Sequence, residues 1–93
     1  MKQDIWKYAF SWEPGVEDID MPGNARIVSI GIQNNTPVMW AIVDPEAINY
    51  PRRMYKHMTG IPLYGGADAI DFLGTLQHPI HLYVIHIFIY KGD

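Results

Sequence analysis

The 93-residue chain contains no cysteine. This absence excludes disulfide frameworks, zinc sites built on thiolates and thiol nucleophiles, and it agrees with a reducing compartment. The serines, Ser11 and Ser29, do not lie in the G-x-S-x-G motif of serine hydrolases. Neither the Walker phosphate loop nor the glycine motif of dinucleotide-binding folds occurs. Because these catalytic signatures are lacking, we expect a protein that is not an enzyme and needs no cofactor.

Long apolar runs and a strong excess of charge are also lacking. The longest apolar stretch, residues 80–90, contains His81 and His86 and is about half as long as a membrane-spanning helix. Residues 1–10 interleave charged with apolar side chains, which is not typical of a signal peptide. The formal net charge of -3 gives no general attraction to nucleic acids or anionic lipids. We therefore expect a cytoplasmic protein whose partner is neither a membrane nor a nucleic-acid polymer.

The composition favours a single β-rich domain over residues 1–93. Hydrophobic residues make up 48% of the chain and aromatic residues 13%, which is enough to form a core without a metal or a disulfide. The seven prolines and eight glycines are spread between short apolar segments, as in strands joined by turns. The expected fold is mainly β, a small antiparallel sandwich or barrel of five to six strands with at most one short helix.

The alternation of apolar and polar residues predicts where the strands lie. The expected strands cover residues 5–10, 26–33, 36–43, 51–59, 71–77 and 81–90. Asn34 and Asn35 tolerate a positive φ and predict a tight turn between the second and third of these strands. Two Pro-Gly pairs interrupt the acidic segment 13–25, for which we expect a loop or a short excursion. Residues 64–70 fit either a short helix or a loop.

The last expected strand, residues 81–90, is apolar on both faces. Such a strand usually lies at the centre of a sheet or is covered by another subunit. Left bare at an edge, it would promote aggregation, so a closed barrel, a two-layer sandwich or a dimer is expected. We accordingly expect a homo-oligomer.

The stretch PRRMYKHMTG, residues 51–60, holds the highest local density of positive charge. Three cations lie within five positions there, in a chain that has only seven Lys and Arg. The candidate ligand- or partner-binding residues are Arg52, Arg53, Tyr55, Lys56 and His57.

Alternation gives the two faces of this expected strand different uses. Arg53, Tyr55 and His57 share one face, where an arginine can hold a phosphate and aromatic rings can stack on a base. Arg52 and Lys56, backed by two methionines, share the other face and would suit a protein-binding surface. A third interpretation is an exposed edge strand whose charges prevent pairing with other chains. The sequence leaves all three open.

The histidines raise the question of a metal site, because imidazole is a common ligand. The chain has no H-x-H or H-E-x-x-H spacing. On one strand, His81 and His86 are separated by an odd number of positions and point to opposite faces. His78 and His81 flank a proline in an expected turn and can converge. We expect hydrogen-bonded, partly buried histidines, His57 included, and no metal.

Four segments resemble a family of small proteins of tailed bacteriophages and their prophages. They are IWKYAF at 5–10, MPGNARIVSIGIQNNTPVMWAIVDP at 21–45, FLGTLQ at 72–77 and HIFIY at 86–90. The most specific pieces are the I-W-K-Y start and the hairpin that ends in W-A-x-V-D-P. The resemblance spans nearly the whole chain and implies a protein made in the cytoplasm of an infected bacterium. It carries no catalytic residue over to this chain.

Small phage accessory proteins without catalytic machinery often bind and block host factors. The resemblance therefore implies a non-enzymatic accessory protein that inhibits or sequesters a host factor. The expected partner is a host protein, such as an anti-phage defence protein, or a small nucleotide messenger of that defence. The alternative is a small structural component of the virion or of its assembly.

Overall fold

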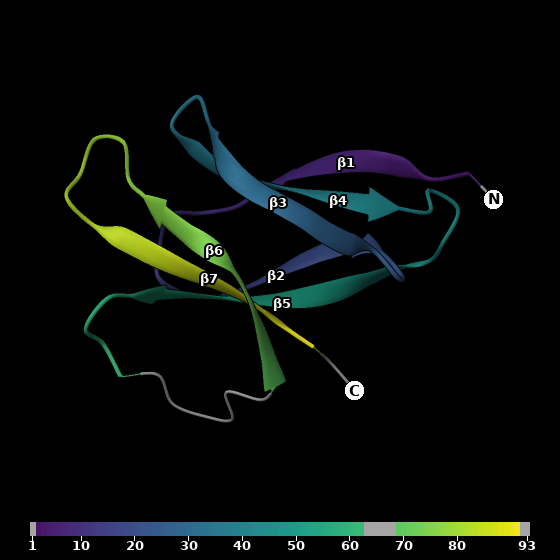
Figure 1. Ribbon diagram of the computed structural model, residues 1–93. Coiled ribbons are helices and arrows are strands. Elements are labelled where there is room, and N and C mark those ends of the chain that lie inside the picture. The colour runs from purple at the N-terminus through teal and green to yellow at the C-terminus, as the bar shows by residue number, and fades with distance from the viewer. Residues whose placement is uncertain (1, 63–68, 92–93) are drawn as a thin grey trace.

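The computed structural model describes residues 2–62 and 69–91, in which seven antiparallel strands form two sheets (Figure 1). The strands are β1 (Asp4–Ala9), β2 (Gly15–Pro22), β3 (Arg26–Gln33), β4 (Thr36–Val43), β5 (Asn49–Met58), β6 (Ile70–Gln77) and β7 (Val84–Tyr90). The mainly β fold predicted from the sequence is confirmed, with one strand more than expected. The choice between a helix and a loop at 64–70 falls largely on residues outside the described ones, and Ile70 begins β6.

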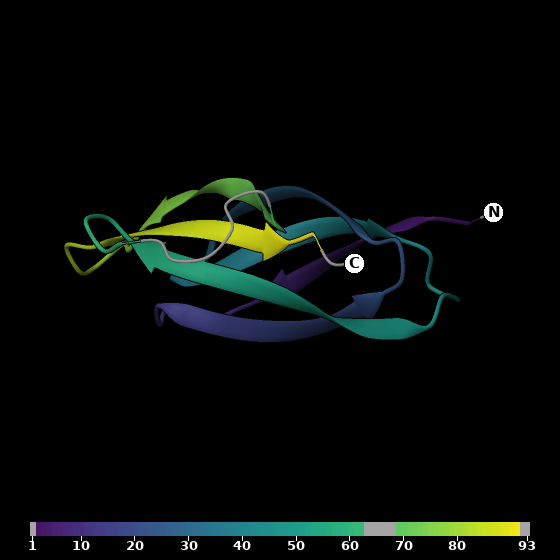
Figure 2. The ribbon, with the colours of Figure 1, turned by 90° about the horizontal axis from the view of Figure 1, so that it is seen from below.

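The two sheets pack as the layers of a sandwich. One sheet has the order β1-β4-β3 and the other the order β2-β5-β7-β6. In Figure 2 the four-stranded sheet lies in front, with β6 uppermost and β2 lowest, and the three-stranded sheet lies behind it. β7 is an inner strand of its sheet, as its two apolar faces predicted. Of the two predicted architectures, a sandwich or a barrel, the structure therefore shows the sandwich.

A methionine-rich and isoleucine-rich core joins the two sheets. The largest fully buried side chains are Met21, Met39, Met54, Ile85, Ile87, Val43 and Pro37. All of these except Pro37 belong to one cluster that draws on strands of both layers, for example Met39 from β4 and Met54 from β5. Burying side chains of this size contributes about 1.5–3 kcal/mol each. This burial is the main source of stability that joins the two sheets.

The hairpin of β3 and β4 has the predicted bounds and the predicted turn. Asn34 and Asn35 have φ angles of 51° and 63°, the left-handed conformation that a two-residue hairpin turn requires. Gln33 pairs with Thr36 across this turn. The Asn-Asn pair therefore sets the register of the three-stranded sheet.

The acidic segment expected to be a loop instead contains β2, and this prediction was wrong. The two Pro-Gly pairs lie at the two ends of an eight-residue strand rather than inside a loop. β2 pairs with β5 along its whole length, from Gly15 opposite Lys56 to Pro22 opposite Asn49. Carboxylates of β2 lie beside cations of β5, and this charge complementarity stabilises an acidic strand. Sequence alternation within β2 alone does not show its partner.

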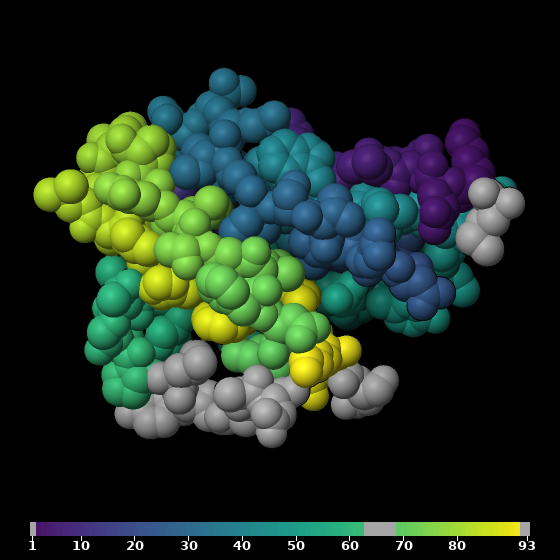
Figure 3. Space-filling model, in the orientation of Figure 1, coloured from purple at the N-terminus to yellow at the C-terminus, as the bar shows by residue number. Residues whose placement is uncertain are grey.

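β6 and β7 also differ from expectation at one end. β7 begins at Val84, because the three residues before it belong to the turn that follows β6. A β-bulge lies between Phe72 and Gly74. A Cβ atom at Gly74 would lie 2.6 Å from Cδ1 of Ile30, so β3 and β6 approach closely here. Figure 3 shows these two strands side by side at the meeting of the two sheets.

Candidate functional site

The two faces of β5 separate the predicted site residues into two groups. Met54 is fully buried and Lys56 is only 4% exposed, so the face that carries Arg52 and Lys56 points to the core. Arg53 lies on the opposite, outer face, where its side chain is about half exposed. The hypothesis that Arg52 and Lys56 form a methionine-backed surface for a protein partner was therefore wrong. The alternation was predicted correctly, but the sequence does not show which face is buried.

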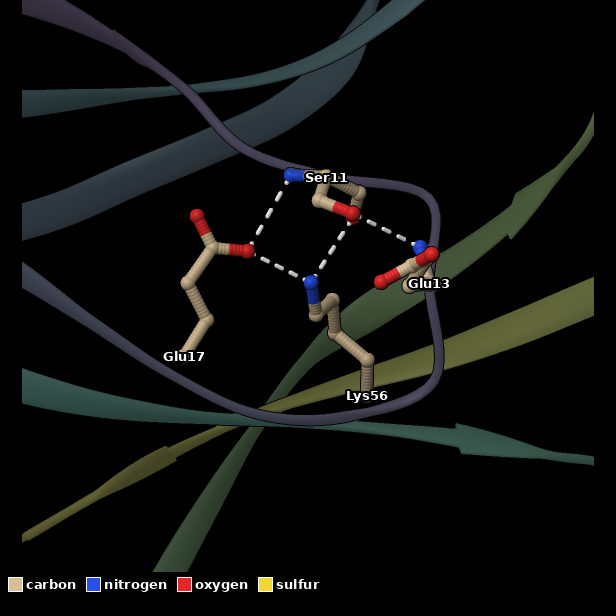
Figure 4. A network of polar contacts seen from close by, with 4 residues as sticks. All are labelled: Ser11, Glu13, Glu17 and Lys56. Atoms are coloured by element: carbon tan, nitrogen blue, oxygen red, sulfur yellow. Dashed lines mark hydrogen bonds and ion pairs between the residues drawn. The ribbon is translucent and has the colours of Figure 1, made fainter.

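Lys56 holds the connection between β1 and β2 in place (Figure 4). Its Nζ donates to the carboxylate of Glu17 at 2.5 Å and to the backbone carbonyl of Ser11 at 2.9 Å. The same Glu17 oxygen accepts the backbone N–H of Ser11 at 3.1 Å. The Lys56 side chain is 3% exposed and that of Glu17 is 29% exposed. A buried cation is thus compensated by one carboxylate and one carbonyl, which gives Lys56 a structural role.

Arg53 forms a two-pronged ion pair on the outer face of the four-stranded sheet. Its Nε and Nη2 donate to the two carboxylate oxygens of Asp18 at 2.9 and 3.1 Å. The hydrogen bond from Arg53, followed by its charge, lowers the pKa of Asp18 below its usual value, so Asp18 is ionised at neutral pH. A guanidinium has five N–H donors, and this pair uses two of them. The side chain is therefore held in a fixed direction with donors to spare.

A cavity of about 500 Å³ opens beside this ion pair. It is lined by Asp18, Pro51, Arg52, Arg53, Tyr55, Tyr90 and Lys91. Arg53 and Lys91 bring cationic side chains to this site beside one carboxylate, whereas Arg52 lies on the core-facing side of β5 and directs its guanidinium to the carbonyl of Ala25. The lining is locally positive in a chain of net charge -3. The structure brings Arg52, Arg53 and Tyr55 together here, and Lys56 and His57 are not part of the lining.

The cationic residues that line the cavity differ in how far neighbouring groups neutralise their charge. Arg52 donates from Nη1 to the carbonyl of Ala25 at 3.0 Å, a neutral acceptor that leaves its charge in place. Lys91 lies 3.5 Å from a carboxylate oxygen of Asp71, and both side chains are about half exposed or more. An exposed pair at this distance is worth little and exchanges readily. An anion entering the cavity would therefore meet positive charge that is only partly neutralised.

Aromatic and apolar side chains extend this face across all four strands. Cross-strand pairing places Val16 beside Tyr55, Tyr55 beside Phe88, and Phe88 beside Phe72. The rings of Phe72 and Phe88 lie 5.4 Å apart. Phe72 is 60% exposed and Val16 57% exposed. The cavity thus lies at one side of an apolar row on an otherwise polar surface.

The rings of His57, His78 and His86 are engaged in hydrogen bonds, as expected, whereas His81 is exposed and its ring stacks on Tyr83. His57 Nε2 lies 2.6 Å from the carbonyl of Ile61. His86 lies between two hydroxyls, with Nε2 2.6 Å from Thr59 Oγ1 and Nδ1 2.9 Å from Thr75 Oγ1. Within residues 2–62 and 69–91, no group of three or more His, Asp or Glu side chains could hold a metal ion.

His78 shapes the turn between β6 and β7. The Nδ1 atom of its ring accepts the backbone N–H groups of Ile80 and His81, both at 3.1 Å. The backbone N–H of His78 donates to the carbonyl of Tyr83 at 3.0 Å. The ring lies 4.6 Å from those of Trp12 and His81. Partial burial, and second the charge of His81, lower the pKa of His78. An Nδ1 atom that accepts two hydrogen bonds must be unprotonated, which agrees with this direction.

The protein is expected to lose stability as the pH falls below about 6.5, where an unfolded histidine takes up a proton. Because the pKa of His78 is lowered in the folded protein, the unfolded chain takes up a proton at His78 at a higher pH than the folded chain does. The resulting loss of folding stability is complete once the pH lies below the pKa of His78 in the folded protein. Urea unfolding of the wild type and of His78→Asn at about pH 7.5 and about pH 5.5 tests this. The asparagine keeps an acceptor that does not titrate, so the variant should lose less stability on acidification. Equal losses in both proteins would show that His78 does not contribute.

Among the residues that the structure describes, no helix is long and apolar enough to cross a membrane.

Fold and site together define a small antiparallel β-sandwich with a cationic, tyrosine-lined cavity on the outer face of its four-stranded sheet. A family model matches residues 1–93, the full length, and the chain belongs to this family, a domain of unknown function called DUF7352. No curated protein and no solved structure matches the chain. Membership of the family assigns no activity to any residue, so the function must be argued from the cavity.

The candidate residues did not include Asp18, Pro51, Tyr90 and Lys91, which also line the cavity. Asp18 lies in the segment expected to be a loop, and its pairing with Arg53 follows from the register of β2 on β5. Tyr90 and Lys91 come from the far end of the chain and reach the cavity because β7 pairs with β5. The available signal was the apolar strand 81–90, which was expected to lie at the centre of a sheet or to be covered by another subunit. The apolar pattern of this strand, however, does not show which strand pairs with it.

Proposed function

We propose that this protein is a non-enzymatic binding protein, made by a tailed bacteriophage or prophage, that sequesters a nucleotide in the cytoplasm of its bacterial host. The target class is a small nucleotide messenger of the kind that bacterial defence systems use. The observation that supports this proposal is the cavity in which Arg53, Tyr55, Tyr90 and Lys91 meet.

The size and aromatic lining of the cavity suit a nucleotide. Small-molecule sites commonly have volumes of roughly 300–1,000 Å³, and this cavity measures about 500 Å³. Tyr55 and Tyr90 supply ring faces on which a base can stack, a contact worth about 1–3 kcal/mol per base. Their hydroxyls can also bond to a ribose or to the polar edge of a base. An aliphatic ligand would leave these groups unused.

The charges of the cavity suit a phosphate. Arg53 is held by Asp18 with donors left over. Lys91 has only an exposed, exchangeable partner. Charge-assisted hydrogen bonds of this kind are about twice as strong as neutral ones. An anionic ligand therefore gains more than a neutral one from the same cavity.

The chemistry of the lining supports binding rather than turnover. The lining residues include no serine, cysteine or histidine, and the lone carboxylate, Asp18, is bound to Arg53. An ionised carboxylate with a lowered pKa is a weak general base. A ligand would accordingly be held and released unchanged, which is the behaviour of a sequestering protein.

Isothermal titration calorimetry with four probes tests this function. The probes are adenosine monophosphate, a cyclic dinucleotide, adenosine alone and inorganic phosphate alone. Because a nucleotide uses both the tyrosines and the cations, it should bind at least about tenfold more tightly than either the nucleoside or phosphate. If neither nucleotide releases heat at millimolar concentration, the cavity is not a nucleotide site and a protein target becomes the better explanation.

A further inference from the structure

The turn between β6 and β7 exposes large aliphatic side chains. Leu82 is 98% exposed and Ile80 is 67% exposed. Ile61, in the segment after β5, is 58% exposed. Single exposed aliphatics are common on protein surfaces, whereas bulky apolar groups on neighbouring loops mark interaction sites. Both loops lie at the same end of the four-stranded sheet in Figure 2.

A second cavity lies directly beside Leu82. It has a volume of about 380 Å³ and is lined by Met58, Thr59, Leu82, Tyr83 and Val84. Its walls carry no charged side chain, and only Thr59 contributes a polar side chain other than the Tyr83 hydroxyl. The space is larger than a leucine side chain. An exposed apolar knob and an apolar hole therefore occupy the same surface.

The turn that presents Leu82 is held in one shape. His78 accepts two backbone N–H groups of the turn and donates to the carbonyl of Tyr83. The rings of His81 and Tyr83, which flank Leu82, are stacked with an interplanar angle of 6°. A knob presented by a fixed turn loses little conformational entropy when it binds. The exposure of Leu82 is therefore a feature of an ordered segment.

We propose that a second copy of this chain covers this surface, with Leu82 of each protomer inserted into the cavity beside Leu82 of the other. A twofold interface is self-complementary, because the same patch serves both subunits. A knob adjacent to its own hole meets this requirement directly. Each copy carries a net charge of -3, and the uncharged patch lets two such copies meet without opposing like charges.

This interface leaves the nucleotide cavity open. Arg53 and Met58 are five positions apart on β5, which corresponds to about 17 Å along the strand. The dimer and the nucleotide site can therefore be tested independently, and failure of one leaves the other standing.

Sedimentation velocity of the wild type, Leu82→Glu and Ile48→Glu tests the dimer. The protein concentration is about 100 μM, well above a micromolar dissociation constant. Ile48 is 71% exposed and precedes β5, at the other end of this strand, so it is a matched control. The wild type and Ile48→Glu should sediment as dimers and Leu82→Glu as a monomer, all with the same circular dichroism spectrum. A monomeric wild type, or a dimer that survives Leu82→Glu, would overturn the proposal.

Cross-linking provides a second, independent readout because the chain has no cysteine. A short bismaleimide linker should convert Leu82→Cys to covalent dimers in high yield, since the two Leu82 positions lie near the twofold axis. The control Ile48→Cys should remain monomeric under the same conditions. Equal yields for the two variants would show that Leu82 does not lie in an interface.

Discussion

Replacing Glu17 with alanine should lower the free energy of unfolding by about 3–5 kcal/mol. The variant leaves the Lys56 ammonium buried, with the carbonyl of Ser11 as its remaining partner. An uncompensated buried charge is among the most destabilising defects in a protein, and domains of this size have only about 5–15 kcal/mol of stability. Urea denaturation followed by circular dichroism measures the loss. The variant is expected to be close to unfolding at room temperature.

Two further variants show whether the buried charge causes this loss. Asp18→Ala removes the next carboxylate of β2, whose partner Arg53 is exposed, and should leave stability close to that of the wild type. Adding Lys56→Met to Glu17→Ala should recover much of the lost stability, because no buried ammonium then remains. If Glu17→Ala is as mild as Asp18→Ala, Lys56 is not a buried cation.

Replacing Arg53 with alanine should weaken nucleotide binding at least about tenfold. The variant removes a guanidinium that Asp18 holds at the cavity and leaves the Asp18 carboxylate unpaired, where it repels a phosphate. Because Arg53 is exposed, its melting temperature should change little. Calorimetry with the nucleotide that binds the wild type measures the change. Affinity for the nucleoside alone should change much less.

The matched control for this variant is Arg26→Ala. Arg26 is an exposed arginine on β3, in the other sheet, and does not line the cavity. Its loss lowers the net charge equally, so it accounts for any long-range electrostatic effect. Equal weakening by Arg26→Ala and Arg53→Ala would contradict a specific phosphate contact at Arg53.

Much of the fold could be predicted because several strands carry local signals. The hairpin 26–43 was predicted correctly since both its alternation and its Asn34-Asn35 turn lie in one continuous segment. β2 was missed because its acidic residues are stabilised by cations that lie more than thirty positions away, as in the pairing of Asp18 with Arg53. Long-range charge pairing across strands leaves no mark in local periodicity.

The candidate site was predicted only in part, for a related reason. Strand periodicity separates Arg53 and Tyr55 from Arg52 and Lys56, but it does not state which set faces the core. The residue type of Lys56 gives no sign of burial, because lysine is rarely buried. Its buried position depends on Glu17, which lies in the segment expected to be a loop. Tyr90 and Lys91 join the site only through the order of the strands.

Native mass spectrometry of the protein purified gently from bacterial cytoplasm tests the proposed nucleotide site most directly. The wild type should carry an adduct of a few hundred daltons, the size of a ligand that fills a cavity of this volume, and Arg53→Ala should lack it. Fragmentation of the adduct should release a phosphate-containing species. A wild-type protein that shows no adduct, and that still binds none after incubation with a nucleotide extract of the host, would contradict the assignment of this cavity.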